Sequence, residues 1–143
     1  MPRRTIAIAT ALSLLALGSP LITANANPLA DNLFNSGVDK YYQGDYQGAI
    51  TDYDKAIEID PQFEDVYYWR ASAKTKLGDH QGAIADWTKV IEFNPKSGRS
   101  GLSYRNRGVD KAWIEDHEGA CVDWKEAASL GDEDAAGWVK EFC

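Results

Sequence analysis

The sequence is poor in positive charge, with 15 Lys and Arg residues against 22 Asp and Glu and a formal net charge of −7. A chain this acidic repels phosphate backbones and anionic lipid headgroups. We therefore expect no nucleic-acid partner. With 143 residues, of which 44% are hydrophobic and 26% charged, the composition is that of one modest globular domain.

Long hydrophobic runs are also missing, apart from one near the N-terminus. Two arginines precede an apolar run over 6–17, and the small-residue sequence Ala24-Asn25-Ala26 follows it. This run of about 12 residues falls short of the roughly 20 that span a bilayer, which favours a cleaved secretory signal peptide over the alternative, a permanent anchor. We predict a signal peptide over 1–26 and no stable membrane insertion after its cleavage.

Cleavage at that point leaves 117 residues with 13 Lys and Arg against 22 Asp and Glu, a net charge of −9. The expected location is an exported one: the periplasm, the thylakoid lumen or the medium. The signal peptide alone does not distinguish between these compartments.

Residues that commonly carry catalysis or bind metals are few, with two histidines and two cysteines in the whole chain. No Ser, Cys or carboxylate constellation converges with both His80 and His117, as general-base catalysis would require. There is no Cys-x-x-Cys motif, and the acidic stretch over 132–134 lacks the spaced ligands of a calcium loop. We expect no enzyme activity, no metal site and no cofactor.

The dominant feature of the sequence after residue 26 is an internal repeat. Gly44-Asp45-Tyr46-Gln47-Gly48-Ala49-Ile50 recurs 34 residues later as Gly78-Asp79-His80-Gln81-Gly82-Ala83-Ile84. A third copy, Glu115-Asp116-His117-Glu118-Gly119-Ala120-Cys121, lies 37 residues further on. The three extra residues predict a longer loop over 96–101.

Each repeat is expected to form two helices, because Gly-Asp interrupts its middle and proline cannot continue a helix at its end. The pattern predicts first helices over 31–43, 64–77 and 102–114, and second helices over 47–59, 81–93 and 118–130. After Gly131, a last helix over 132–143 carries one apolar stripe and is expected to cover the open end of the array.

The repeat resembles the tetratricopeptide repeat family, and the resemblance covers roughly residues 30–131. The family's small first-helix residue falls on Gly37, Ala71 and Gly108, its second-helix alanine on Ala49, Ala83 and Ala120, its large aromatic on Tyr53, Trp87 and Trp124, and its closing proline on Pro61 and Pro95. It implies an all-α, right-handed superhelix of three repeats, about 30–63, 64–97 and 101–131, with a capping helix over 132–143. Short exported arrays of this kind look like those of cyanobacteria and other Gram-negative-type bacteria.

The resemblance also implies a concave groove, lined by the first helices, that holds peptides or protein segments. The family's groove positions fall here on Tyr41, Tyr42, Tyr68, Trp69, Ser72, Lys76, Arg105, Asn106 and Trp113. About half of the groove aromatics are expected to serve packing instead. Family members that grip the C-terminal carboxylate of chaperones use Lys and Asn where this chain has Phe34 and Val38, so that clamp is absent.

These observations predict a non-enzymatic protein-interaction module that binds an unidentified protein or peptide partner as a scaffold or assembly factor. Two alternatives stay open. The protein could be an accessory subunit that recognises a glycan or a modified peptide, or a structural homo-oligomer.

Two side-chain pairings follow from spacing. Cys121 and Cys143 each lie 11 residues from a turn near residue 132, so antiparallel helices would bring their sulfurs together. In an oxidising compartment this predicts a disulfide; the alternative is two separate buried thiols. Arg70 and Arg107 each precede an aspartate, Asp86 and Asp123, by 16 residues, which predicts an arginine–aspartate pair in two repeats, whereas Asp52 would lack this partner.

One segment is basic within this otherwise acidic chain. Between residues 96 and 111 there are five Lys and Arg residues and one acid, Asp110. A solvated face is the favoured interpretation, and a site for an acidic partner is the alternative.

Overall fold

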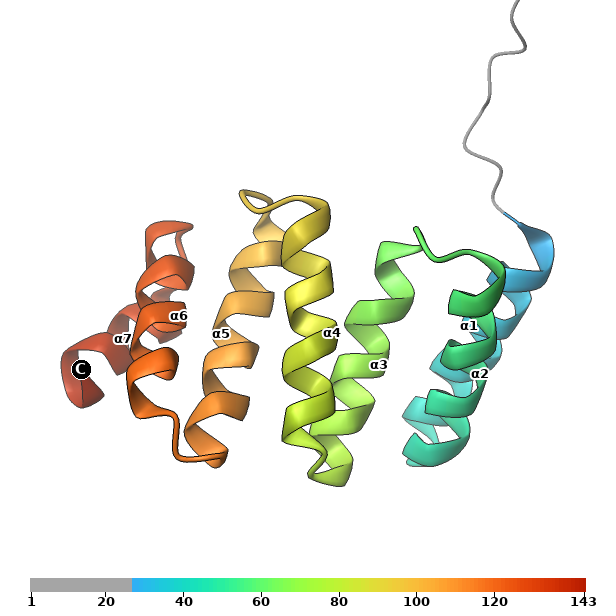
Figure 1. Ribbon diagram of the computed structural model, residues 1–143, viewed down its shortest axis with the longest axis horizontal. Helices are drawn as coiled ribbons and strands as arrows, with labels where there is room; N and C mark the ends of the chain where they lie inside the picture. The colour runs from blue at the N-terminus through green and yellow to red at the C-terminus, as the bar shows by residue number, and fades with distance from the viewer. Residues whose placement is uncertain (1–26) are drawn as a thin grey trace, which may run out of the picture.

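The computed structural model describes residues 27–143, which form seven α-helices (Figure 1). The predicted signal peptide, 1–26, lies outside the described residues. The helices are α1 (Pro28–Tyr42), α2 (Tyr46–Ile59), α3 (Glu64–Leu77), α4 (His80–Phe93), α5 (Gly98–Trp113), α6 (His117–Ser129) and α7 (Glu133–Phe142).

Each helix packs against the helices that precede and follow it in the sequence, so the molecule extends along one axis from α1 to α7. The pairs α1/α2, α3/α4 and α5/α6 are three helix-turn-helix repeats, and α7 packs on α6 at the far end. This confirms the all-α solenoid with a capping helix. Within residues 27–143, no helix is both long and apolar enough to cross a membrane.

The Asp-x-x-Gly sequence common to the three repeats is explained by the start of each second helix. Asp45, Asp79 and Asp116 are N-caps, and each carboxylate accepts a hydrogen bond from the backbone N–H three residues on. That third residue is always glycine, because a Cβ there would collide with the capping carboxylate. The motif is therefore a structural one.

The prediction of a loop over 96–101 is wrong in its bounds, because residues 98–101 belong to α5. α5 begins at Gly98, because the Ser97 side chain caps it by accepting from the backbone N–H of Ser100 at 3.1 Å. Most of the three extra residues thus add to the first turn of α5, which has 16 residues where α3 has 14.

A large aromatic residue of each second helix fills the space beside a small residue of the first. Tyr53, Trp87 and Trp124 are all buried. A Cβ on Gly37 would clash with the Tyr53 ring, and one on Gly108 would clash with the Trp124 indole. The small residues therefore set how closely paired helices approach.

The two predicted arginine–aspartate pairs are confirmed. Arg70 makes a bidentate contact with Asp86 at 2.8 and 2.6 Å, and Arg107 makes one with Asp123 at 2.8 and 2.7 Å. A lysine one turn later also reaches the same carboxylate, Lys74 at 2.8 Å and Lys111 at 2.9 Å.

Asp52 is not left alone in the first repeat, because Ser36 donates to it at 2.7 Å and Lys40 at 2.6 Å. Burial alone would raise the pKa of Asp52, but hydrogen bonds from Lys40 and Ser36 and the lysine charge hold it below its usual value. Every repeat thus has one buried aspartate neutralised from its first helix.

Candidate binding groove

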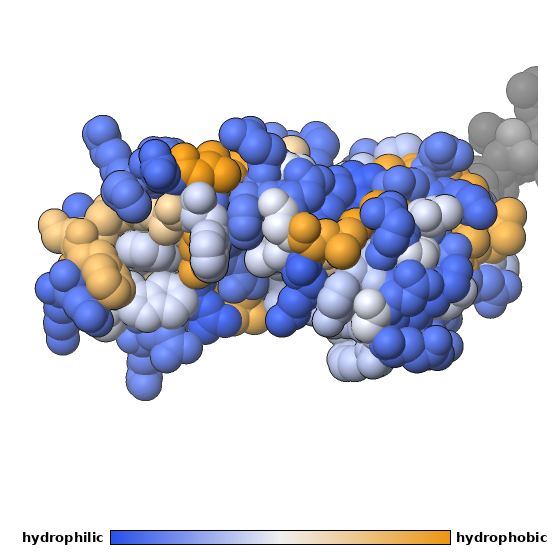
Figure 2. All heavy atoms as spheres, turned by 90° about the horizontal axis from the view of Figure 1, so that it is seen from below, coloured by the Kyte–Doolittle hydropathy of each residue, from blue (hydrophilic) through white to orange (hydrophobic). Residues whose placement is uncertain are grey.

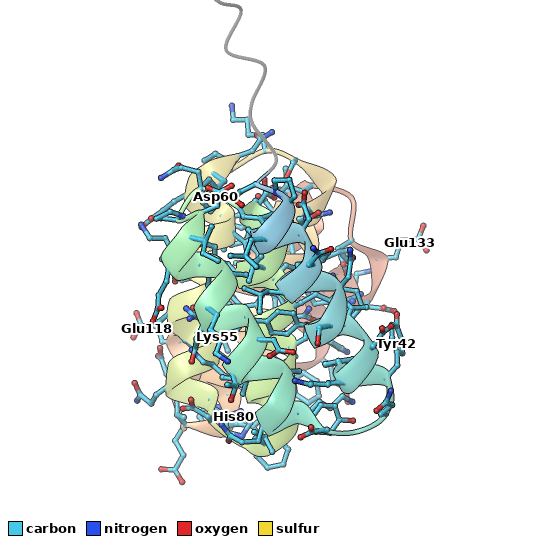
Figure 3. All side chains as sticks on the ribbon, turned by 90° about the vertical axis from the view of Figure 1, so that its right-hand side faces the viewer. Tyr42, Lys55, Asp60, His80, Glu118 and Glu133 are labelled. Carbon is cyan, nitrogen blue, oxygen red and sulfur yellow. A yellow bond between two sulfur atoms is a disulfide. The ribbon has the colours of Figure 1, made fainter. Side chains whose placement is uncertain are left out.

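The first helix of each repeat and α7 share one side of the molecule. In Figure 3, Tyr42 of α1 and Glu133 of α7 project to the same side, whereas Glu118 of α6 projects to the opposite side. The surface that the sequence assigns to a partner is therefore built from α1, α3, α5 and α7.

A cavity of about 210 Å³ lies in the middle of this surface, and we call it the middle cavity. Residues of all three repeats line it: Tyr41, Ser72, Thr75, Lys76, Trp87, Asn106 and Val109. The structure therefore brings together four of the predicted groove residues: Tyr41, Ser72, Lys76 and Asn106.

A larger cavity of about 500 Å³, which we call the end cavity, lies between α5 and α7. Its lining residues are Val109, Ala112, Trp113, Glu115, His117, Trp124, Trp138 and Phe142. Because Val109 lines both cavities, they adjoin along one groove. Figure 2 shows pale and orange atoms, from residues of intermediate and high hydropathy, at the end of the molecule where α6 and α7 lie.

Tyr42, Tyr68 and Trp69, three of the predicted groove aromatics, pack on other aromatic rings and line neither cavity. Trp69 lies within 5.2 Å of Tyr41 and 5.7 Å of Tyr42, measured between ring centroids, and edge-to-face in both cases. Tyr68 packs on Trp87 at 5.1 Å. Tyr41 and Trp69 also pack against the core of the first repeat, whereas Tyr42 is 75% exposed. Burial raises the pKa of both Tyr41 and Tyr68.

The cations of the basic segment are mostly neutralised by acids nearby. Arg105 pairs with Asp132 at 3.2 Å and with Asp134 at 3.1 Å, and so ties α5 to the start of α7. Arg99 pairs with Glu64 and Asp65, while Arg107 and Lys111 share Asp123. Over residues 96–111, Lys96 alone makes no ion pair with the described residues. The segment is thus largely structural. Most of the cations that an acidic partner would need are already paired within the protein.

A buried carboxylate network between the second and third repeats was not anticipated. Asp110 is fully buried and accepts hydrogen bonds from Trp87 Nε1 at 2.8 Å, Thr75 Oγ1 at 2.9 Å and His80 Nδ1 at 2.7 Å. The sequence contains a signal for it, because Asp110 occupies the repeat position of the buried Ala73. An acid at a buried position requires partners.

Cys121 and Cys143 form a disulfide with an S–S distance of 2.03 Å, which joins α6 to the residue that follows α7. Cys121 lines a cavity of about 370 Å³ that shares Ala112, His117, Trp124 and Phe142 with the end cavity. The disulfide therefore holds one wall of the groove in place. Among residues 27–143, no group of three or more His, Cys, Asp or Glu side chains is placed to hold a metal ion.

Comparison with known proteins agrees with this architecture. A TPR repeat family model matches residues 37–78, and a tetratricopeptide repeat family model matches residues 65–97. Residues 37–97 are thus similar to tetratricopeptide repeats. A search of curated proteins finds no match.

Solved structures extend the likeness to most of the chain. The N-terminal domain of stress-induced protein-1 (STI-1) from C. elegans is 22% identical, with a TM-score of 0.76, over 82% of this chain and 98% of that one. The second TPR domain of human RPAP3 is 20% identical over 80% and 95% of the two chains, with a TM-score of 0.72. The first TPR domain of Spaghetti (RPAP3) is 24% identical over 80% and 90%, also with a TM-score of 0.72. At these identities the likeness establishes the fold alone.

Proposed function

We propose that this protein is a non-enzymatic interaction module that binds an extended peptide or protein segment in its groove, as a scaffold or assembly factor in an exported compartment. The observation that carries the proposal is the continuity of the groove. The middle and end cavities adjoin at Val109, and residues of α1, α3, α5 and α7 line them together with Trp87 of α4 and with His117 and Trp124 of α6. An extended segment has a path across all three repeats.

Proteins of the same fold support this mode of binding. The first TPR domain of Spaghetti is bound to the HSP90 peptide SRMEEVD, and the second TPR domain of human RPAP3 to the HSP70 peptide SGPTIEEVD. This chain differs at the groove positions that would receive such an acidic end. Phe34 and Val38 are partly buried and pack against the core of the first repeat. We expect a partner of different chemistry.

Export is the second part of the proposal, and two features support it. The sequence over 1–26 has the pattern of a signal peptide. A disulfide between Cys121 and Cys143 suits an oxidising compartment, because disulfides are rare in the cytosol.

Panning a random peptide library against the oxidised protein, residues 27–143, tests the groove. Ser72→Arg places a large side chain in the middle cavity and is expected to abolish capture of the selected peptides. Thr51→Arg is the matched control, because Thr51 lies exposed on α2 and its hydroxyl, like that of Ser72, donates to the carbonyl four residues earlier. Equal loss in both variants, or no selected peptide, would contradict the proposal.

A glycan-recognising accessory subunit is a second candidate, favoured by the tryptophans of the end cavity, since aromatic faces also stack on sugar rings. Glycan-array binding that Trp113→Ala removes, with no peptide captured, would favour this candidate. A mass that rises with concentration in sedimentation, again without peptide capture, would favour the structural homo-oligomer.

A further inference from the structure

Glu115 adopts a backbone conformation that residues with a Cβ rarely adopt. Its φ is 66°, and among the described residues it is the only one other than glycine with a positive φ. The equivalent positions of the first two repeats are Gly44 and Gly78, with φ of 82° and 78°. Glycine takes this conformation without strain, so the third repeat carries a glutamate where its fold would favour glycine.

Strained backbone is found preferentially at binding sites, and Glu115 lines the end cavity. Trp113 and Phe142, which line the same cavity, are 69% and 62% exposed. Large aromatic side chains left open to solvent in this way mark interaction surfaces. Glu115 itself is exposed and makes no ion pair with any residue of 27–143.

The aromatic walls of the end cavity are held in place. Trp124 is buried and contacts Trp138 at 5.4 Å and Phe142 at 6.1 Å, measured between ring centroids. One face of Trp113 is stacked on His80, which is itself fixed by Asp110. Phe142 directly precedes the disulfide-bonded Cys143. A ligand that enters finds indole and phenyl faces already positioned.

The lining of the end cavity contains an acidic side chain and no strongly basic one. No lysine or arginine lines it, and its ionisable residues are Glu115 and His117. The chain that surrounds it has a net charge of −9 over residues 27–143, and eight of the 13 Lys and Arg in that part are already in ion pairs. Such a surface attracts cationic groups and repels anionic ones.

We propose that the end cavity binds an arginine or lysine side chain of the partner segment. The methylene groups of that side chain pack between the rings, the cation lies over a tryptophan face, and Glu115 faces its charge. This inference rests on the proposed peptide-binding function and adds the chemistry of the residue that is recognised. An acidic side chain at this point would face the Glu115 carboxylate without a compensating cation.

Indole signals in ¹H–¹⁵N NMR spectra of the oxidised protein provide a direct test. The probes are N-acetylarginine amide and its neutral analogue N-acetylcitrulline amide. We expect the arginine compound to shift the indole signals of Trp113, Trp124 and Trp138 and to leave Trp69, which lies outside the end cavity, unchanged. The citrulline compound is expected to bind at least threefold more weakly. Equal shifts with both compounds, or no shift at these three indoles, would overturn the proposal.

Three variants separate the charge of Glu115 from its backbone. Glu115→Gln removes the charge alone, and we expect the dissociation constant of the arginine compound to rise about threefold. Glu118→Gln makes the same change in net charge at a residue that does not line the end cavity and that projects away from the side of Tyr42 and Glu133 (Figure 3), and it is expected to have no effect. Glu115→Gly also removes the strain, so its melting temperature should rise while its affinity falls as in Glu115→Gln. Unchanged affinity in both Glu115 variants would overturn the proposal.

The two proposals fail differently. Selected peptides that bind in the groove but carry no basic residue, and bind wild type and Glu115→Gln equally, would overturn this inference and leave the peptide-binding function standing. A cavity that binds the arginine compound in a protein that captures no peptide would support the cation preference and contradict the peptide-binding function.

Discussion

His80 stacks on Trp113 with ring centroids 5.5 Å apart and ring planes inclined by 5°, while its Nδ1 donates to the fully buried Asp110 at 2.7 Å. The contact joins the second repeat, which supplies His80, to the third, which supplies Trp113 and Asp110. One histidine thus connects a buried carboxylate to the surface of the proposed groove.

Replacing Asp110 tests how much this hydrogen-bond network contributes to the free energy of unfolding. Asp110→Ala leaves Trp87 Nε1 and His80 Nδ1 without their acceptor, whereas the Thr75 hydroxyl keeps the Ala71 carbonyl. We expect a loss of about 3 kcal/mol in the free energy of unfolding, measured by urea denaturation. Asp39→Ala is the control, since Asp39 is the exposed equivalent in the first repeat and should cost less than about 0.5 kcal/mol. Similar losses in the two variants would contradict the network's role.

The buried arginine–aspartate pair of the third repeat gives a second prediction. Arg107→Ala leaves the buried Asp123 with Lys111 alone, and we expect a loss of about 3 kcal/mol. Arg99→Ala breaks a solvent-exposed pair and should change stability by about 0.5 kcal/mol at most. Thermal and urea denaturation measure the stability of both variants. If the Arg107→Ala protein is as stable as the Arg99→Ala protein, the Arg107–Asp123 pair does not stabilise the fold as predicted.

The first repeat predicts a pH dependence. Burial alone would raise the pKa of Asp52, but hydrogen bonds from Lys40 and Ser36 and the charge of Lys40 depress it below its usual value in the folded protein. A depressed carboxyl pKa contributes stability that is present above the unfolded-state value and is lost as pH falls through the folded-state value. Asp52→Asn should therefore lose less stability than wild type between pH 5 and pH 3. Glu58→Gln, an exposed change on the same helix, should follow wild type.

The disulfide predicts a redox-dependent stability. Without reductant, the unfolded protein should react with no thiol reagent, and after reduction it should react at two cysteines. Reduction removes a crosslink between residues 22 apart in the sequence, which is expected to cost about 3 kcal/mol of stability in the loop-entropy model. The double variant with Cys121→Ser and Cys143→Ser should melt at the same temperature with and without reductant. Two reactive thiols before reduction would exclude the disulfide.

The composition of the groove predicts a negative result with chaperone peptides. Calorimetry with SRMEEVD should show no saturable binding, because Phe34 and Val38 pack into the core where a cation would be required. The TPR domain of Spaghetti serves as the positive control. Micromolar binding by this chain would show that other residues replace the missing clamp.

The helical array was predictable because each repeat is specified locally. Periodic apolar residues, the aspartate N-caps and the prolines place most helix ends within two residues of those observed. The start of α5 was missed because it depends on Ser97, a cap that lies within a segment rich in Gly and Ser. Local sequence patterns describe elements better than the connections between them.

Contacts between repeats were harder to predict, because they depend on which side of one helix faces the next. Arg105 was assigned to the groove, but its partners Asp132 and Asp134 come from the start of α7. The Asp110 network joins α3, α4 and α5, and no single repeat contains it. The strain at Glu115 could have been noticed, because aligning the three repeats places it opposite two glycines.

The arginines at equivalent positions of the second and third repeats each reach back to the preceding repeat as well as to their own aspartate. Arg70 donates to Asp54 of α2 at 2.6 Å, and Arg107 donates to Thr88 of α4 at 2.9 Å. Melting of the first repeat therefore removes a partner of Arg70, and melting of the second removes a partner of Arg107, so each repeat stabilises its neighbour. Amide hydrogen exchange should consequently be slowest in α3 and α4, which are coupled on both sides, and fastest at the two ends of the array.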